Sequence, residues 1–159
     1  MTLEFRLNQH SSILELDGPS WNQLTGDSPF LRYEFLAALE KTGCVDADTA
    51  WQSMHLTVTN QAGRLLGALP LYAKYNSLGE FVFDWSWADA FERAGGHYYP
   101  KLVTAIPFAP VTGRRLLIDP HAEDRAQIAE LMVGAGVRAC DDNGMSSWHC
   151  LFPESDELA

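Results

Sequence analysis

Two stretches of helical apolar spacing, separated by strand-like patterns, restrict the fold of this chain more than any other feature. The first stretch follows Ser28–Pro29, a capping residue before a proline, and it ends at Gly43. The second follows the same signal at Asp119–Pro120 and ends at Asn143–Gly144. Both predict amphipathic helices. Their core-facing residues are Leu31, Phe35, Ala38 and Leu39 in the first helix, and Ile128, Leu131, Met132, Ala135 and Ala139 in the second.

Segments in which apolar residues recur at every second position lie before, between and after these helices. This two-residue period is typical of strands and predicts a sheet. Residues 54–58 alternate, residues 65–72 are almost continuously apolar, and the turn at residues 60–63 between them predicts an antiparallel hairpin. Because hairpin turns and helical crossovers both occur, we expect an α/β (α+β) fold with a mixed, mainly antiparallel sheet flanked by helices. Shorter strands are expected at residues 3–7, 102–108, 115–118 and 148–152.

The length and charge of the chain exclude several classes of protein. With 159 residues the chain can form one domain with a real core. Its formal net charge of −10 opposes binding to a nucleic-acid duplex and docking on an anionic membrane surface. No apolar run approaches the roughly 20 residues of a membrane span, and the N-terminus lacks the apolar region of a signal peptide.

The cysteines and histidines indicate neither disulfides nor a metal centre. Cys44, Cys140 and Cys150 are odd in number and show no CxxC spacing, so we expect reduced thiols in a cytoplasmic protein. The five histidines form no HxxxH or HExxH pair, and no dedicated metal site is therefore predicted.

The densest group of aromatic and charged residues spans residues 81–101. Its large rings alternate along the chain, which predicts a strand that carries all of them on one face. Asp84 and Ser86 would then project from the opposite face. Such a segment builds either a dense core or the wall of a ligand site. The alternating rings are Phe81, Phe83, Trp85 and Trp87.

The two carboxylates of this block have a functional and a structural interpretation. Asp84 and Asp89 could act as general bases or bind an amine, because desolvation among indoles would raise the pKa of a carboxyl group. Alternatively, they accept hydrogen bonds from buried N–H groups or pair with Arg93 or Lys101. The sequence leaves both interpretations open.

The aromatic residues and His97 are equally ambiguous. Trp85 and Trp87 could stack on a sugar, a nucleobase or an acyl chain, or they could pack in the core. His97, Tyr98 and Tyr99 follow Gly95–Gly96, so they could lie on a loop near a pocket, although a lone histidine is more often structural.

Six longer segments carry distinctive sequences: PFLRYEFL at 29–36, GALPLY at 67–72, GEFVFDWSWAD at 79–89, YYPKL at 98–102, PFAPVTG at 107–113 and LFP at 151–153. Together these segments resemble the FemAB-like, GNAT-related proteins over nearly the whole chain. That family is described as peptidoglycan biosynthesis or recognition proteins, or as N-acyltransferases. The resemblance implies two GNAT-like halves in tandem, of which residues 1–159 would be the first, a single GNAT-like domain.

The resemblance implies transfer of an acyl or aminoacyl group to an amine on a small molecule, glycan or peptide. An acyl-CoA or aminoacyl donor is compatible with it, and no cofactor is firmly implied. A non-catalytic glycan or peptide recognition module and a purely structural half are the alternatives. The missing second half or a homodimer partner would then cover exposed apolar surface.

The implied roles divide among three groups of residues. Asp84, Asp89 and His97 would be catalytic, and Thr112, Gly113 and Arg114 would bind the acyl donor at a strand-to-helix junction. The glycines of residues 131–136 lack the leading Arg or Gln of an acyl-CoA loop, and residues 134–139 match a dinucleotide fingerprint only weakly. The substrate-binding residues would be Trp85, Trp87, Arg93, Tyr98, Tyr99 and Lys101.

Overall fold

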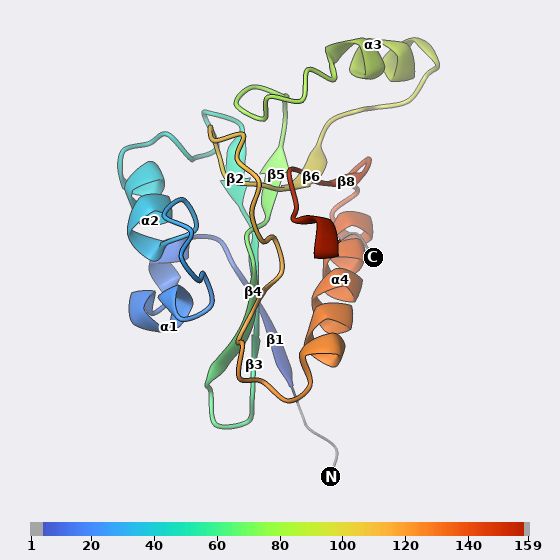
Figure 1. Ribbon diagram of the computed structural model, residues 1–159. Coiled ribbons are helices and arrows are strands. Elements are labelled where there is room, and N and C mark those ends of the chain that lie inside the picture. The colour runs from blue at the N-terminus through green and yellow to red at the C-terminus, as the bar shows by residue number, and fades with distance from the viewer. Residues whose placement is uncertain (1–4, 158–159) are drawn as a thin grey trace.

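The computed structural model describes residues 5–157 and contains short strands, helices on both sides of them, and one projecting segment (Figure 1). The helices are α1 (Gly18–Asn22), α2 (Tyr33–Lys41), α3 (Trp85–Arg93) and α4 (Arg125–Asp142), with 3-10 turns at Ile13–Glu15 and Ser155–Glu157. The strands are β1 (Arg6–His10), β2 (Trp51–Ser53), β3 (His55–Thr59), β4 (Leu65–Leu69), β5 (Tyr72–Lys74), β6 (Lys101–Thr104), β7 (Leu117–Ile118) and β8 (Trp148–Cys150).

The strands form two four-stranded sheets joined through one long hairpin. One sheet has the order β1-β3-β4-β7 and is antiparallel throughout. The other has the order β2-β5-β6-β8, in which β6 and β8 are parallel. Only Met54 separates β2 from β3, and its N–H donates to the Leu71 carbonyl at 2.8 Å between β4 and β5. The hairpin therefore continues from one sheet into the other.

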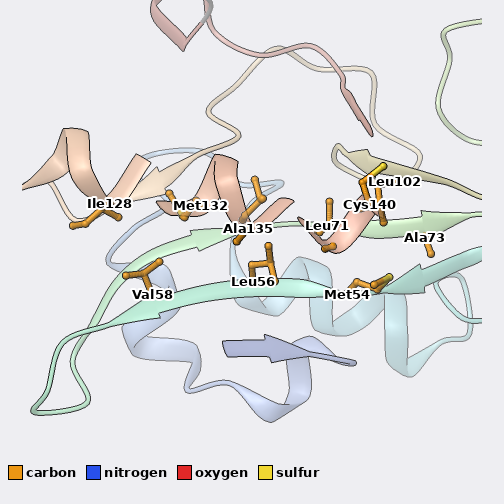
Figure 2. Packing of buried hydrophobic residues seen from close by; sticks show 12 residues of the cluster. Met54, Leu56, Val58, Leu71, Ala73, Leu102, Ile128, Met132, Ala135 and Cys140 are labelled. Atoms are coloured by element: carbon orange, nitrogen blue, oxygen red, sulfur yellow. The ribbon is translucent and has the colours of Figure 1, made fainter. Parts of the chain in front are cut away.

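Helix α4 covers one face of the strands, and α1 with α2 covers the opposite face (Figure 1). A hydrophobic core lies between the strands and α4. In Figure 2, Met54, Leu56 and Val58 of the hairpin face Ile128, Met132 and Ala135 of the helix across this core. The helix approaches so closely that a Cβ at Gly67 would lie 2.8 Å from the Ile128 side chain. At Gly136 a Cβ would lie 2.6 Å from the Trp148 ring. Small residues in this part of α4 thus serve helix packing.

A second core lies under α1 and α2. Trp21 is fully buried there, and its Nε1 donates to the Leu31 carbonyl at 2.8 Å. The same cluster contains Leu36 and Leu117 from α2 and β7. Because the tryptophan satisfies its only polar atom within the core, it anchors the loop between α1 and α2.

Glu40 of α2 joins the helix to the start of the chain and to the hairpin. Its carboxylate accepts hydrogen bonds from Ser53 Oγ at 2.7 Å, from Ile13 N–H at 3.0 Å and from Ser12 Oγ, and it lies 3.5 Å from His55 Nε2. Burial alone would raise its pKa, but these donors outweigh burial and hold the pKa of Glu40 at about 2.

We expect Glu40→Gln to remove part of the acid sensitivity of the protein. The folded pKa lies below the unfolded one, so Glu40 stabilises the fold fully above pH 4.5 and loses this contribution as the pH falls toward 2. In urea unfolding, the gap between wild type and variant should be largest at pH 7 and should shrink at pH 3. Glu92→Gln, at an exposed position, is the matched control. A gap that is the same at both pH values would contradict this account.

The predicted fold class is confirmed: the fold is mixed α+β, and its strands are mainly antiparallel. The hairpin of residues 54–72 and the second helix are also confirmed. Both helix starts were predicted too early, because α2 begins after Arg32 and α4 after Asp124. Leu3 lies outside the described residues, so the start of the first predicted strand stays a prediction. The predicted relation to GNAT proteins stays a prediction.

The strand predicted for residues 81–87 is wrong. Phe81 and Phe83 have positive φ angles of 62° and 53°, and a regular helix begins at Trp85. Among the residues that the structure describes, no strand pairs with residues 81–87, so these residues are not part of either sheet. Residues 75–100, which we call the arm, instead leave β5, form α3 away from the layers, and return to β6 (Figure 1).

Candidate functional site

A buried ionic cluster at the base of the arm centres on Lys101. The Lys101 side chain is fully buried, and its Nζ lies 2.6 Å from Asp84 Oδ2 and 2.8 Å from Glu80 Oε2. It also donates to Ser77 Oγ at 3.0 Å. Since β6 supplies the lysine and the arm supplies its three partners, the cluster fastens the arm to the sheet.

A second buried lysine lies beside this cluster. Lys74 Nζ donates to the Leu78 carbonyl at 3.0 Å and lies 3.8 Å from the centroid of the Trp51 ring. No carboxylate lies within ion-pair distance of it in the described part of the chain. Burial lowers the pKa of Lys74 to about 8, although the nearby Glu80 opposes that shift. The base of the arm therefore holds two lysines and two carboxylates, Glu80 and Asp84, out of water.

Asp84 accepts hydrogen bonds instead of capping α3. Tyr98 Oη donates to Asp84 Oδ2 at 2.7 Å, alongside Lys101. Burial alone would raise the pKa of Asp84, but the hydrogen bonds from Lys101, Ser77 and Tyr98 outweigh burial and hold the pKa at about 2. The raised pKa expected from the sequence is therefore wrong, and Asp84 is a poor proton acceptor near neutral pH. Its pairing with Lys101, the structural alternative, is confirmed.

A pocket of about 390 Å³ lies between the arm and β8, and Asp84 forms part of its wall. Two aromatic rings of α3 and the Tyr98 ring supply most of the arm side. The other side comes from β8 and the residues around it. The lining residues are Val82, Asp84, Trp87, Phe91, Tyr98, Ser146, Ser147, His149 and Leu151.

His149 contributes the imidazole of this pocket. Its ring centroid lies 6.1 Å from that of Tyr98, and its Nε2 lies 2.8 Å from Ser147 Oγ. Burial lowers the pKa of His149, and the positive charge of Lys101 lowers it further, while Asp84 opposes the shift. The pKa of His149 therefore lies below the ordinary value for histidine, which is about 6.5, and the imidazole is neutral at pH 7.

The sequence prediction did not include His149. The alternation of residues 148–152 contained the signal, because a strand that turns Trp148 and Cys150 to one side turns His149 and Leu151 to the other. What the sequence could not supply was the opposite wall, since α3 and β8 lie more than 50 residues apart in the chain.

The structure brings together some of the predicted catalytic and substrate-binding residues and separates others. Trp87, Tyr98 and Asp84 line the pocket. Lys101 lies directly behind Asp84, and Tyr99 Oη lies 2.7 Å from Ser77 Oγ in the same network. The remaining four are exposed on the arm and do not line this pocket: Trp85, Asp89, Arg93 and His97.

The predicted acyl-donor residues lie in a different place. Thr112, Gly113 and Arg114 border a separate cavity of about 550 Å³ near the α1–α2 loop. The Arg114 guanidinium is paired with Asp156 at 2.5 Å and with Glu154 at 3.3 Å, and the Gly113 N–H donates to the Phe152 carbonyl. Because these donors are already engaged and acidic residues surround them, the segment does not fit a diphosphate group.

One further sequence signal, the dinucleotide-like match, has a structural explanation. The dinucleotide-like residues 134–139 lie inside α4 rather than at a strand-to-helix turn, so the fingerprint does not have the required context. Within residues 5–157 no group of three histidine, cysteine or acidic side chains is arranged to hold a metal ion. No helix in that range is both long and apolar enough to cross a bilayer.

Comparison with known proteins identifies a family. A protein-family model for FemAB-like proteins, described as peptidoglycan biosynthesis/recognition, matches residues 12–159. The match includes the arm, the buried ionic cluster and both walls of the pocket. No curated protein shows a significant match to the chain.

Proposed function

Because this chain belongs to the FemAB-like family of peptidoglycan biosynthesis and recognition proteins, we propose that its pocket binds an amine-bearing fragment of a peptidoglycan-type glycan or peptide. The pocket surrounds such a group with the rings of Trp87, Phe91 and Tyr98. Aromatic faces attract ammonium groups and also stack on the apolar faces of sugars. Asp84 adds a negative charge to the same wall.

We further propose that the bound amine is the acceptor of an acyl or aminoacyl group, and that His149 is its general base. The observation that carries this assignment is the half-buried imidazole facing the Asp84–Tyr98–Lys101 network across the pocket. After the ammonium group has released one proton to solvent, the neutral amine nitrogen forms a bond to the carbonyl carbon of an activated ester or thioester, and the bond from that carbon to the leaving group breaks. His149 accepts the proton released by the nitrogen and returns it to the leaving group.

Non-catalytic recognition of the same glycan or peptide is the second candidate. The ion pairs of Arg114 with Glu154 and Asp156 favour it, because they leave the predicted donor segment without a free cation. On this alternative, the pocket binds its ligand and the chain transfers nothing.

Ligand binding tests whether the pocket, rather than another part of the arm, is the binding site. With muramyl dipeptide and glucosamine as probes, calorimetry should give saturable binding that weakens about tenfold or more in Trp87→Ala, since an aromatic contact contributes about 0.5–1.5 kcal/mol beyond its burial. Trp85→Ala is the matched control, because Trp85 lies on the same helix but does not line the pocket. Equal losses in both variants, or no binding of either probe, would contradict the proposed site.

Transfer is tested separately by mass spectrometry of the same amines after incubation with an acetyl thioester. A product that forms only with the intact pocket would support transfer. Binding without any product would support recognition.

A further inference from the structure

Ser147 and His149 form a hydroxyl–imidazole pair on the wall of the pocket. Ser147 Oγ lies 2.8 Å from His149 Nε2, and both side chains line the cavity of about 390 Å³. Ser147 immediately precedes β8 and His149 lies two positions later, so the two side chains project from the same side of the extended chain. A hydroxyl within about 2.6–3.2 Å of a base is the arrangement of an activated nucleophile.

The hydrogen bonds around the pair direct the Ser147 hydroxyl toward the imidazole. The neighbouring Ser146 Oγ donates to the Tyr98 carbonyl and lies 3.4 Å from Ser147 Oγ, which makes it the more distant partner. His149 Nε2, at 2.8 Å, is the closer acceptor. Burial holds the pKa of His149 below its ordinary value, so at pH 7 the neutral imidazole can accept the hydroxyl proton.

Backbone hydrogen bonds hold Ser147 in place. The Ser146 N–H donates to the Pro100 carbonyl at 2.8 Å. The Leu102 N–H donates to the Ser147 carbonyl, also at 2.8 Å, so the chain is tied to β6 and the residue before it. Within residues 5–157 the Ser147 N–H has no hydrogen-bond partner, so it is available to an oxyanion that forms beside its own Oγ. The hydroxyl is therefore presented to the pocket from a fixed backbone.

We propose that Ser147 is a nucleophile that carries the acyl group before it is transferred. Ser147 Oγ forms a bond to the carbonyl carbon of an activated ester or thioester, and the bond from that carbon to its leaving group breaks. His149 accepts the hydroxyl proton and passes it to the leaving group. In the second step a neutral amine or a water molecule bonds to the acyl carbon, and the bond from that carbon to Ser147 Oγ breaks. His149 takes the proton of the attacking atom and returns it to Ser147 Oγ.

A covalent step explains how one small pocket can serve both the donor and the acceptor. The predicted donor segment borders a different cavity, and its Arg114 is paired with acidic residues. At about 390 Å³, the pocket lies near the lower end of the range for small-molecule sites, roughly 300–1,000 Å³, and suits one substrate at a time. An acyl-serine lets the leaving group depart before the amine enters. The inference rests on the proposed function for its base, His149, but acylation of Ser147 needs no amine.

Labelling of the full chain with an alkyl fluorophosphonate tests the nucleophile. The serine oxygen bonds to phosphorus and fluoride leaves, so the label stays on the protein. Mass spectrometry of the intact chain should show one label, and peptide mapping should place it on Ser147. Labelling should be lost in Ser147→Ala and slowed about 10²–10⁴-fold in His149→Asn, which removes the base. Ser86→Ala is the control and should label like the wild type, because Ser86 is an exposed serine of α3 that does not line the pocket.

The site of the label and the transfer assay together separate this inference from the proposed function. Peptide mapping of the wild-type protein locates the label without relying on the folding of any variant. No label, or a label on Ser146 or elsewhere, would overturn the nucleophile, and so would transfer that is unchanged in Ser147→Ala. If acylated glucosamine still forms in either case, the amine attacks the donor directly and the proposed function stands. A label on Ser147 without any acylated amine would support the nucleophile and contradict transfer to the amine.

Discussion

Replacing Lys101 by methionine is expected to lower the free energy of unfolding at pH 7 by about 3–5 kcal/mol, which is the usual cost of removing one partner from a buried ion pair. The reason is that Glu80 and Asp84 would remain as two negative charges beside each other, both largely out of water. Urea unfolding followed by circular dichroism measures the loss.

The size of the loss should depend on those two carboxylates. Adding Glu80→Gln and Asp84→Asn to Lys101→Met should recover a substantial part of it, because neutral amides replace the unpaired charges. Lys41→Met, at the exposed end of α2, should change the free energy of unfolding by less than about 0.5 kcal/mol. If Lys101→Met proves no more costly than Lys41→Met, the cluster does not fasten the arm.

Replacing His149 by asparagine is expected to lower the rate of acyl transfer to a pocket-bound amine by about 10²–10⁴-fold, the range typical of a lost general base. Ligand binding should change far less, because the aromatic wall stays in place. His97→Asn is the matched control, since His97 is exposed on the arm and does not line the pocket. Initial rates with the amine and thioester of the transfer assay measure both variants.

The pH profile distinguishes a base from a residue that only supports the pocket. Burial lowers the pKa of His149, so the wild-type rate should decline only below the ordinary pKa of histidine. In His149→Asn this acidic limb should disappear. A variant that is slower but keeps the limb would assign His149 a positioning role, and the proton acceptor would have to be another group.

Much of the fold could be predicted because its signals are local. The hairpin and the body of α4 each carry an uninterrupted apolar period with a clear stop, so the hairpin and the end of α4 were predicted correctly. The starts of α2 and α4 were less accurate because Ser28–Pro29 and Asp119–Pro120 form turns that resemble helix caps. A capping residue followed by proline occurs both in turns and at helix starts, so by itself it does not fix the first residue of a helix.

The arm could not be predicted because its structure depends on distant residues. The alternation of large rings over residues 81–87 is compatible both with a strand and with the observed irregular segment that leads into α3. The decisive contacts run from Asp84 and Glu80 to Lys101, and from the arm to β8. For the same reason the sequence indicated Asp84 and Tyr98 as site residues but overlooked His149, which reaches the pocket from a strand at the other end of the chain.

The attachment of α3 has a consequence for how the pocket can be altered. Ala88 is the only buried residue of the helix, so α3 has almost no hydrophobic contact of its own with the rest of the molecule. The residue before the helix, Asp84, is instead bound to Lys101. The position of the Trp87 and Phe91 rings is therefore determined by electrostatics at the root of the helix rather than by packing along it. Selection for a new ligand could exchange the rings themselves with little cost in stability, whereas moving them requires a rearrangement of buried charge.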